Sequence, residues 1–405
     1  MTTAAKARAT GPLAGVKVLD IANVLAGPIA CQVLGDFGAD VIKVEHPRLG
    51  DPLRGHGFRK DGEELWWKTI ARNKKAITID LSQPAGADLL KALATQADVV
   101  VENFRPGTIE RWGLGYDELS RDNPGLILLR ISGFGQTGPY AERRAFGTIV
   151  ESMSGWAHLT GPADGPPTLP PFGLADNLAA LAGVTAVMMA LYHRDARGGG
   201  GQVIDVSLLE PIMATLAVQH IYYDQLGVTL HRQGNRSENS GPRGVFRTSD
   251  DKWVAVSASS DQVAGRLMRM VGHPEVTEEP WFKGGGERAR HNEELEEMVS
   301  SWMAARTRVE IIEQAEAEGI PLGPVYDAAD VMTDPHINET GMVTTVEDPQ
   351  LGPVRMHNVL FRMSATPGGI AFPGRALGAD TDEVLAKELG LTNEQLDKLR
   401  AKEII

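Results

Sequence analysis

The stretch VKVLDIANVLAGPIACQVLGDFGADVIKVEH, residues 16–46, decides the fold class of this chain. Val16–Ile21 and Val41–Val44 are β-branched apolar runs, which are typical of strands. The residues between them predict a helix that begins after Pro28 and ends at Gly38. One strand–helix–strand unit therefore opens the chain.

The same alternation continues toward the middle of the chain. Apolar runs at Ala97–Val101 and Leu126–Ile131 each have a helical stretch before them, at Gly86–Thr95 and Tyr116–Arg121. Alternating strands and helices predict an α/β fold with an open, Rossmann-like parallel sheet. In such sheets, ligands bind in the crevice at the carboxyl ends of the strands.

The composition predicts a second, smaller domain. After a helical stretch at 206–224, the chain becomes a polar loop, HRQGNRSENSGPRG, followed by a strand and charge-rich helices. We expect a large domain in residues 1–205, a linker helix at 206–224, and a smaller α+β domain at 225–330. Residues 331–405 are expected to return and complete the large domain.

Charge excludes one broad class of function. The 405 residues have a formal net charge of −13, and a strongly acidic protein repels a polyphosphate backbone. Residues 1–144 contain 19 Lys and Arg against 17 Asp and Glu, which leaves 21 against 36 for the rest. General nucleic-acid binding is therefore disfavoured, whereas a site for a small polyanion such as a coenzyme fits the first part.

The sequence also predicts a cytoplasmic protein. The single cysteine, Cys31, cannot form an internal disulfide and lies in an apolar stretch, as an inert core thiol does. Met1–Gly11 lacks the apolar segment of a signal peptide. The longest apolar run, Leu178–Tyr192, has 15 residues, fewer than the ~20 that span a bilayer.

Common catalytic motifs are missing from the sequence. Gly133, Gly135 and Gly138 fit GxGxxG after a strand, but Pro139 and polar residues follow where a dinucleotide fingerprint needs a helix. There is no HExxH, no paired CxxC and no GxSxG. A metal centre and a serine hydrolase are therefore both disfavoured.

Two features of the sequence can be interpreted either as purely structural or as parts of a functional site. Basic residues cluster near the predicted strands, either as solvated surface charges or as an anion site at the sheet crevice; they are Arg72, Lys74, Lys75, Arg105, Arg111, Arg143 and Arg144. Asp176 opens the most apolar helix, where it can be an N-cap with a pKa at or below ~3.9. An ionised carboxylate at a cleft wall can also be a nucleophile.

As a group, the motifs resemble the family III CoA-transferases, which include formyl-CoA and carnitine CoA-transferases and the related α-methylacyl-CoA racemases. The resemblance rests on PLAGVKVLDIANVLAGP, GADVIKVEHP, ARNKKAITIDL, ADVVVENFRPGTIERWGLGYDEL, NPGLILLRISGFGQTGPY, SMSGWAHLTG, DGPPTLPPFGLADN, ALYHRDARGGGGQVIDVSLLE, GIPLGPVYDAADVMTDPHI and LGADTDEVLAKELGL. These motifs cover nearly the whole chain, in the order of the family.

The resemblance implies an acyl-CoA:carboxylate CoA-transferase that works through an aspartyl mixed anhydride and an aspartyl-CoA thioester. It places the nucleophile on Asp176 within LADN, with a CoA thioester as substrate and no tightly bound cofactor. It also implies an interlocked homodimer. The coenzyme A contacts that it implies are Lys74, Lys75, Asn103, Phe104, Arg105, Arg111 and Arg144.

The resemblance leaves two alternatives open: a racemase of the same superfamily, and a non-catalytic CoA-ester-binding protein. Racemisation needs a base and an acid on opposite faces of the substrate carbon. In the racemase branch, the catalytic histidine lies nine residues before the serine that corresponds to Ser154. That position is Ala145 here, or Phe146 one residue later, and neither side chain accepts a proton. The transferase is therefore favoured, with a partly apolar acyl pocket expected around Leu25, Phe146, Trp156 and His158.

Overall fold

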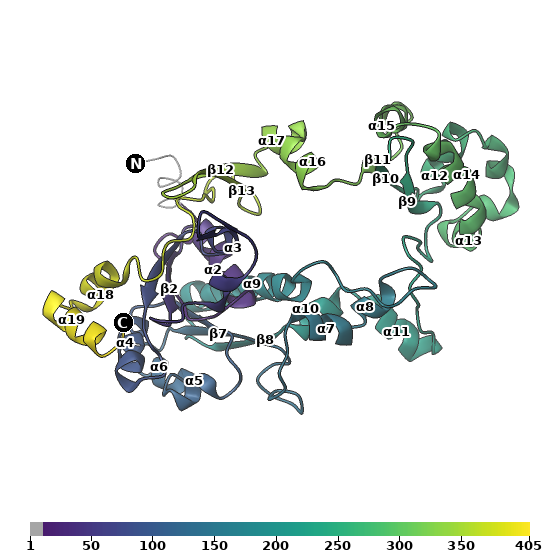
Figure 1. The fold of residues 1–405 in the computed structure, drawn as a ribbon. Coiled ribbons are helices and arrows are strands. Elements are labelled where there is room, and N and C mark those ends of the chain that lie inside the picture. The colour runs from purple at the N-terminus through teal and green to yellow at the C-terminus, as the bar shows by residue number, and fades with distance from the viewer. Residues whose placement is uncertain (1–10) are drawn as a thin grey trace. The chain divides into compact units, whose positions relative to one another are not determined.

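The computed structural model describes residues 11–405, so all but the last residue of Met1–Gly11 lies outside the described part. The chain forms two compact units (Figure 1). The larger unit comprises the residues up to 156, with 169–227 and 336–405, and the smaller unit comprises 157–168 and 228–335. The segment 157–168, which we expected in the large domain, thus belongs to the smaller unit.

A six-stranded sheet forms the centre of the larger unit. All its neighbouring strands are parallel, in the order β5-β2-β1-β6-β7-β8. The strands are β1 (Lys17–Asp20), β2 (Asp40–Glu45), β5 (Lys74–Thr78), β6 (Val99–Glu102), β7 (Ile127–Ser132) and β8 (Val203–Ser207). The expected open α/β sheet is therefore confirmed.

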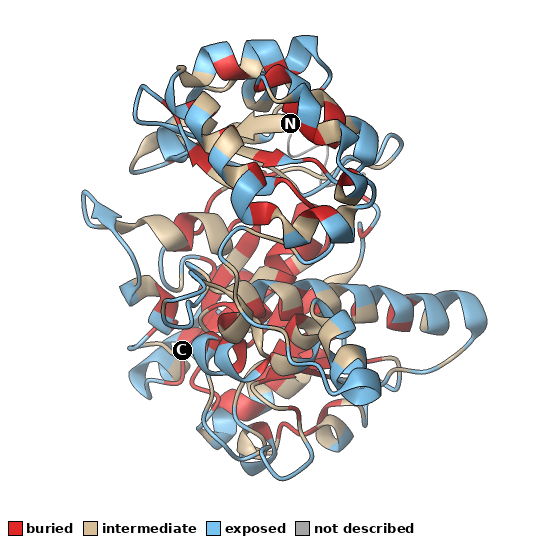
Figure 2. Ribbon diagram, turned by 90° about the vertical axis from the view of Figure 1, so that its right-hand side faces the viewer, coloured by how far each residue is buried: buried red, intermediate tan, exposed pale blue. Residues whose placement is uncertain are grey.

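Alternating side chains of the strands supply a separate core on each face of the sheet. Val18, Val99 and Val101 pack with α2 (Ala26–Asp36) and α9 (Leu174–Arg197) on one face. Leu19 and Val100 pack on the other face, with helices from two distant parts of the chain. These helices are α4 (Pro84–Ala94), α5 (Thr108–Arg111), α6 (Tyr116–Leu119), α18 (Thr381–Leu389) and α19 (Asn393–Ala401). Figure 2 marks residues of the sheet and of the helix faces toward it as buried.

The strand order reverses between β1 and β6. From β1 the chain proceeds to β2 and β5 on one side, and from β6 it proceeds to β7 and β8 on the other. The loops that follow β1 and β6 therefore separate at the carboxyl edge of the sheet and leave a crevice between them. This is the place where open α/β sheets bind their ligands.

Shorter elements complete the larger unit. Helices α3 (Leu65–Ile70), α7 (Gly147–Met153), α10 (Leu209–Ala214) and α11 (Ala217–Leu226) join those above, with the 3-10 turn η1 (Pro52–Gly55). Two small hairpins are β3 (Arg59–Lys60) with β4 (Glu63–Glu64), and β12 (Val343–Asp348) with β13 (Gly352–His357). The expected linker helix at 206–224 is instead two helices, α10 and α11, separated at Thr215 and Leu216.

The smaller unit is built around a three-stranded antiparallel sheet. Its strands are β9 (Arg243–Arg247), β10 (Trp253–Ser257) and β11 (Leu322–Pro324), in the order β11-β10-β9. Its helices are α12 (Asp261–Met270), α13 (Gly285–Arg290), α14 (Asn292–Ala304), α15 (Arg308–Ala317) and α16 (Ala328–Thr333), with 3-10 turns η2 (Pro274–Glu278) and η3 (Pro280–Phe282). Two further helices lie at the boundaries of the units, α8 (Trp156–Leu159) and α17 (Pro335–Glu339).

Helix α9 is longer than its apolar run suggested. It has 24 residues, and within residues 11–405 it is the one helix that is long and apolar enough, by length and composition alone, to cross a membrane. Its buried residues include Ala179, Gly183 and Val187, which lie on the side of α9 that faces β7 and α2. The core helix of a soluble protein passes the same test.

Candidate active site

Two cavities lie at the carboxyl edge of the large sheet. The larger, of about 640 Å³, is lined by the ends of β1, β6 and β7 and by the first turns of α2, α7 and α9. The smaller, of about 290 Å³, is lined by the ends of β1, β2 and β5 and by the segment after β6. Asn23 and Pro52 line both cavities, so the two adjoin.

Asp176 lies in the wall of the larger cavity, but it does not cap its helix. It is the third residue of α9, and Gly173 occupies the N-cap position in a left-handed conformation without a side-chain cap. Instead, Oε1 of Glu151 on α7 accepts the N–H of Ala175 at 3.1 Å. The expected N-cap role of Asp176 is therefore wrong, because a carboxylate from a neighbouring helix caps the backbone.

The charge environment of Asp176 also differs from the expectation. Burial, followed by the negative charge of Glu151, raises the pKa of Asp176 to about 6. The sequence predicted a pKa at or below the ordinary value, because it showed the helix N-terminus but neither the burial nor the second carboxylate. A carboxylate of raised pKa is more basic and more nucleophilic than an ordinary one, and it is still mostly ionised at pH 7.

Gly147, the first residue of α7, lies directly against the carboxylate of Asp176. A Cβ at this position would lie 2.5 Å from Oδ2 of Asp176 and 3.6 Å from Oε1 of Glu151. A separation of 2.5 Å is shorter than any contact that a real Cβ atom makes with a non-bonded atom. The absence of a side chain at Gly147 therefore makes room for the carboxylate of Asp176.

Apolar side chains form much of the remaining wall. Leu25 and Phe146, expected in the acyl pocket, line the larger cavity together with Trp66 and Phe172. Trp156 is packed against the core of the large sheet instead. His158 belongs to the smaller unit, where its ring contacts that of His231.

The segment after β6 contains four of the expected coenzyme A contacts. Asn103 lines the larger cavity, and Phe104 lines the smaller one with its ring against that of Trp112. Arg105 and Arg111 are exposed on the same segment. The segment therefore brings two aromatic rings to the smaller cavity and carries two exposed cationic side chains, of which Arg111 donates to Thr108 Oγ1 at 3.0 Å.

The two lysines that we expected to contact coenzyme A lie at the amino edge of the sheet, the opposite edge from the segment after β6. Lys74 and Lys75 are the first residues of β5, so they stand at the amino end of a strand and not in a loop beside the crevice. Lys74 is buried, and its ammonium donates to Asp20 Oδ2 at 2.8 Å and to the carbonyl of Pro28 at 2.6 Å. Lys75 pairs with Asp40. This burial corrects our expectation that Lys74 contacts coenzyme A.

Arg144 is exposed, shortly before α7.

Sequence reasoning missed several residues of the larger cavity. Glu151 and Gly147 lie outside the quoted motifs, and Ser132 lies inside one without being singled out there. Their positions in the fold place all three in the wall of the cavity that Asp176 lines. Ser132, at the end of β7, is buried in the cavity wall, and its hydroxyl has no hydrogen-bond partner within the described part of the chain. The serine in the quoted RISGFG motif is the one signal that could have drawn attention to it.

Comparison with known proteins gives a consistent result. A sequence model of CoA-transferase family III matches residues 13–381. The chain is 42% identical to the succinyl-CoA–D-citramalate CoA-transferase of Chloroflexus aurantiacus, over 97% of this chain and 98% of that protein. It is 31% identical to the human succinyl-CoA:glutarate CoA-transferase, over 97% of this chain and 90% of that protein. A CAIB/BAIF family protein from Brucella suis has a similar structure, with a TM-score of 0.83 and 32% identity, covering 94% of this chain and all of that one.

Proposed function

Because the chain belongs to CoA-transferase family III, an enzyme family that moves coenzyme A between acyl groups and carboxylates, we propose that Asp176 is its nucleophile. The observation that carries the proposal is the position of this carboxylate, in the wall of the larger cavity with a pKa raised to about 6. A carboxylate suits the reaction, because its attack on a thioester yields an anhydride that preserves the activation of the acyl group.

The proposed reaction has four steps. Asp176 attacks the thioester carbonyl and the C–S bond breaks. The coenzyme A thiolate is released, and an anhydride forms between the acyl group and Asp176. The thiolate then attacks the aspartyl carbonyl, which releases the donor acid and forms an aspartyl-CoA thioester. The acceptor carboxylate attacks this thioester to form a second anhydride and frees the thiolate. Attack of the thiolate on the acceptor's carbonyl gives the new acyl-CoA and restores Asp176.

These steps require no proton transfer, which agrees with the surroundings of Asp176. Ala145 and Phe146 line the cavity where a racemase would need its base. Each tetrahedral intermediate instead needs hydrogen-bond donors for its oxyanion. The hydroxyl of Ser132 and the N-terminus of α2, which begins at Ala26 in the same wall, are suited to this role.

We place the nucleotide part of coenzyme A in the smaller cavity. Its aromatic residues Phe104 and Trp112 offer apolar surface to a base, and the exposed Arg105 and Arg111 offer charge to phosphates. Asn103 and Arg144 remain proposed contacts of the rest of the cofactor. Because the two cavities adjoin at Asn23, the thioester end can reach the larger one.

The function is tested by exchange with purified protein. Succinyl-CoA, incubated with a panel of mono- and dicarboxylic acids, is expected to yield succinate and a new CoA ester of at least one acid, as read by mass spectrometry. Two relatives, named above, exchange succinyl-CoA with citramalate or glutarate, which makes these acids the first to try. Solvent deuterium entering a 2-methylacyl-CoA without any transfer would instead favour the racemase, and binding without either reaction would favour a non-catalytic protein.

The raised pKa of Asp176 predicts a pH dependence. Only the ionised carboxylate attacks, so kcat/KM should rise with pH through about 6 and then level off. Glu151→Gln removes the negative neighbour and keeps an oxygen for the N–H of Ala175. In this variant, the acid limb of the pH profile of kcat/KM should move to lower pH. It should stay above the range of an ordinary aspartate, because burial, the largest cause of the raised pKa of Asp176, remains.

Asp195→Asn is the matched control for this pH experiment. Asp195 lies at the other end of α9 and pairs there with Arg194, so its loss changes the charge of the same helix far from the cavity. Its pH profile should coincide with that of the wild type. An acid limb that stays in place in Glu151→Gln would contradict the proposed interaction between the two carboxylates.

The proposal includes an interlocked homodimer. Helix α11 has no buried residue within the described chain, and Ile221, Tyr223 and Leu226 on it are exposed, as are Met189 and Tyr192 on α9. Exposed apolar surface of this extent is typical of an interaction site. Light scattering of the preparation used for the exchange assay should give twice the mass of one chain, and the mass of a single chain would contradict the dimer.

A further inference from the structure

The loop that joins β1 to α2 forms the boundary between the two cavities. Its Asn23 lines both, and Val24 and Leu25 line the larger one. Asp176 lines that same cavity, so the backbone of this loop and the proposed nucleophile share one chamber. The position of the loop therefore affects how a thioester can lie beside Asp176.

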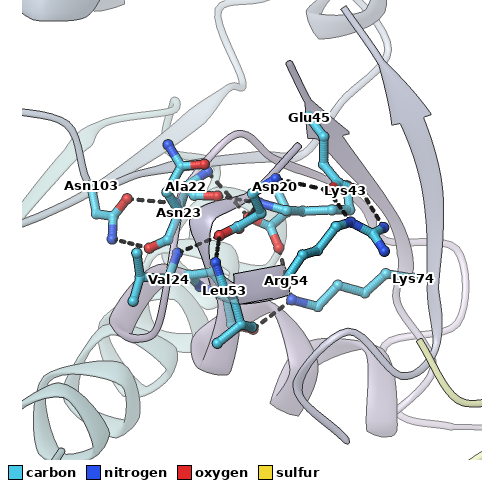
Figure 3. A network of polar contacts seen from close by, with 12 residues as sticks. Asp20, Ala22, Asn23, Val24, Lys43, Glu45, Leu53, Arg54, Lys74 and Asn103 are labelled. Atoms are coloured by element: carbon cyan, nitrogen blue, oxygen red, sulfur yellow. Dashed lines mark hydrogen bonds and ion pairs between the residues drawn. The ribbon is translucent and has the colours of Figure 1, made fainter. Parts of the chain in front are cut away.

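Side chains from other elements hold the backbone of this loop (Figure 3). The N–H of Ala22 donates to Asp20 Oδ1 at 3.2 Å, and the carbonyl of Ala22 accepts from Lys43 Nζ. The N–H of Asn23 donates to Oδ1 of Asn103 at 2.7 Å. The side-chain Nδ2 of Asn103 donates in return to the carbonyl of Asn23, also at 2.7 Å. The N–H of Val24 donates to Asp51 Oδ1 at 2.9 Å.

Val24 has a left-handed backbone conformation, with φ of +65°. A β-branched residue rarely adopts this region, and it does so only where the surrounding structure determines it. The N–H of Val24 donates a hydrogen bond to Asp51, and its side chain packs against the apolar cluster that contains Leu53. The loop is therefore held in a conformation that its own residues disfavour.

Asp51 is itself anchored by buried charges. Its Oδ2 lies 2.9 Å from the ammonium of Lys43, which is also 3.7 Å from Asp20, and Asp20 pairs in turn with Lys74. Burial by itself would raise the pKa of Asp51, but Lys43 and the N–H donors of Leu53 and Val24 bring it below its usual value.

The turn that carries Asp51 is held as well. Glu45 accepts the N–H of Asp51 at 3.0 Å and two hydrogen bonds from Arg54, at 2.7 and 2.8 Å. Buried ion pairs contribute little net stability compared with well-packed apolar residues of the same volume, so their cost favours a positional role. Each member of this network connects to the loop beside the cavity directly or through one or two partners, and Arg54 does so through Glu45 and Asp51.

We propose that Asp51 and Lys43 are positioning residues for the transfer reaction, which hold Val24 in its left-handed conformation and so fix the cavity wall that faces Asp176. This inference rests on the proposed function for its catalytic consequence. Gly50 and Pro52, on either side of Asp51, line the smaller cavity, so the test has to compare kcat with the KM of the CoA ester. If the network acts by holding the loop beside Asp176, its loss should lower kcat by a larger factor than it raises KM.

The test is a graded set of variants. Asp51→Ala removes both the acceptor of the Val24 N–H and the partner of Lys43, and should lower kcat about 20-fold, with the KM for acyl-CoA within about threefold. Asp51→Asn keeps an oxygen for Val24 and should lose less than about fivefold. Adding Val24→Gly to Asp51→Ala should restore most of kcat, because glycine adopts the left-handed conformation without strain.

Asp36→Ala is the matched control. Asp36 forms a buried ion pair with Arg72 at 2.6 Å, and neither residue lines either of the two cavities. Its loss should lower the melting temperature while kcat stays within about twofold. Equal losses of kcat in Asp36→Ala and Asp51→Ala, or no recovery with Val24→Gly, would overturn the proposal. If Asp51→Ala does not fold, Asp51→Asn with and without Val24→Gly gives the same comparison at smaller amplitude.

A second measurement separates this inference from the proposed function. Amide hydrogen exchange of the peptide around Ala22–Ala26 should be faster in Asp51→Ala than in the wild type, and unchanged in Asp36→Ala. If the wild type exchanges no CoA with any acid, the proposed function fails, whereas the exchange rates still decide whether Asp51 holds the loop. If CoA transfer is present and the exchange rates are equal, only the inference about the loop fails.

Discussion

Asp176→Ala is expected to lower CoA transfer at least about a thousand-fold, a loss of roughly 4 kcal/mol of transition-state stabilisation. Among the described residues that line the cavity, Glu151 is the one other carboxylate, and it is buried with Oε1 accepting the N–H of Ala175. The variant should still bind acyl-CoA, since the proposed coenzyme A contacts are Arg144 and residues of the segment after β6, and do not include Asp176. Steady-state exchange and equilibrium binding of a CoA ester measure the two properties separately.

Wild-type protein treated with acyl-CoA should also acquire a covalent adduct. In the absence of an acceptor acid, the one carboxylic acid available to attack the aspartyl-CoA thioester is the released donor acid, which is present at no more than the concentration of the enzyme. Mass spectrometry should therefore find coenzyme A on the peptide that contains Asp176, and Asp176→Ala should give no such peptide. A fully active alanine variant, or an adduct on another residue, would end the proposed role of Asp176.

Gly147→Ala is expected to lower kcat about 100-fold, because displacing a reacting group by around 1 Å can cost this much. The added Cβ would lie 2.5 Å from Oδ2 of Asp176, so the carboxylate has to move. The backbone of Gly147 tolerates alanine, since it lies in α7 outside the positive-φ residues, and alanine favours helices more than glycine does. The loss should therefore appear in kcat, with the KM for the CoA ester little changed and the fold intact.

Gly286→Ala is the control for this substitution. Gly286 also stands in the first turn of a helix, α13, and a Cβ there would meet nothing within 4 Å. Its activity should equal that of the wild type. If Gly147→Ala retained full kcat, the carboxylate of Asp176 would have room to move without consequence, and its tight placement would have no catalytic meaning.

The basic residues illustrate how far sequence reasoning reached. Their grouping near the strands predicted an anion site, and the structure shows Arg105 and Arg111 as exposed side chains on the segment after β6, where they remain proposed contacts of coenzyme A. In the sequence, Lys74 and Lys75 lie just before a predicted strand, whereas Arg105 and Arg111 follow one, and it is the segments that follow strands that meet at the crevice. The strand begins at Lys74, so its side chain runs into the protein and pairs with Asp20.

The sequence singled out Asp176 as a candidate nucleophile, whereas it did not predict the electrostatic surroundings of this carboxylate. A helix N-terminus is visible in the sequence, and it predicted an ordinary or lowered pKa. The raised pKa depends on burial and on Glu151, which is 25 positions earlier in the chain and approaches only because α7 packs against α9. Electrostatic effects fall off with distance in space, so the order of residues along the chain does not contain them.

The sequence by itself determined the alternation of strands and helices, the parallel sheet, the family and the identity of the proposed nucleophile, because local periodicity and motifs record these directly. Only the tertiary structure decided which charges are buried and which face the cavities. Asp51, Lys43 and Val24 are unremarkable in the sequence, and they act on one another only because β1 and β2 pair side by side. A buried charge needs its partner within a few ångströms, and chain folding alone sets that distance.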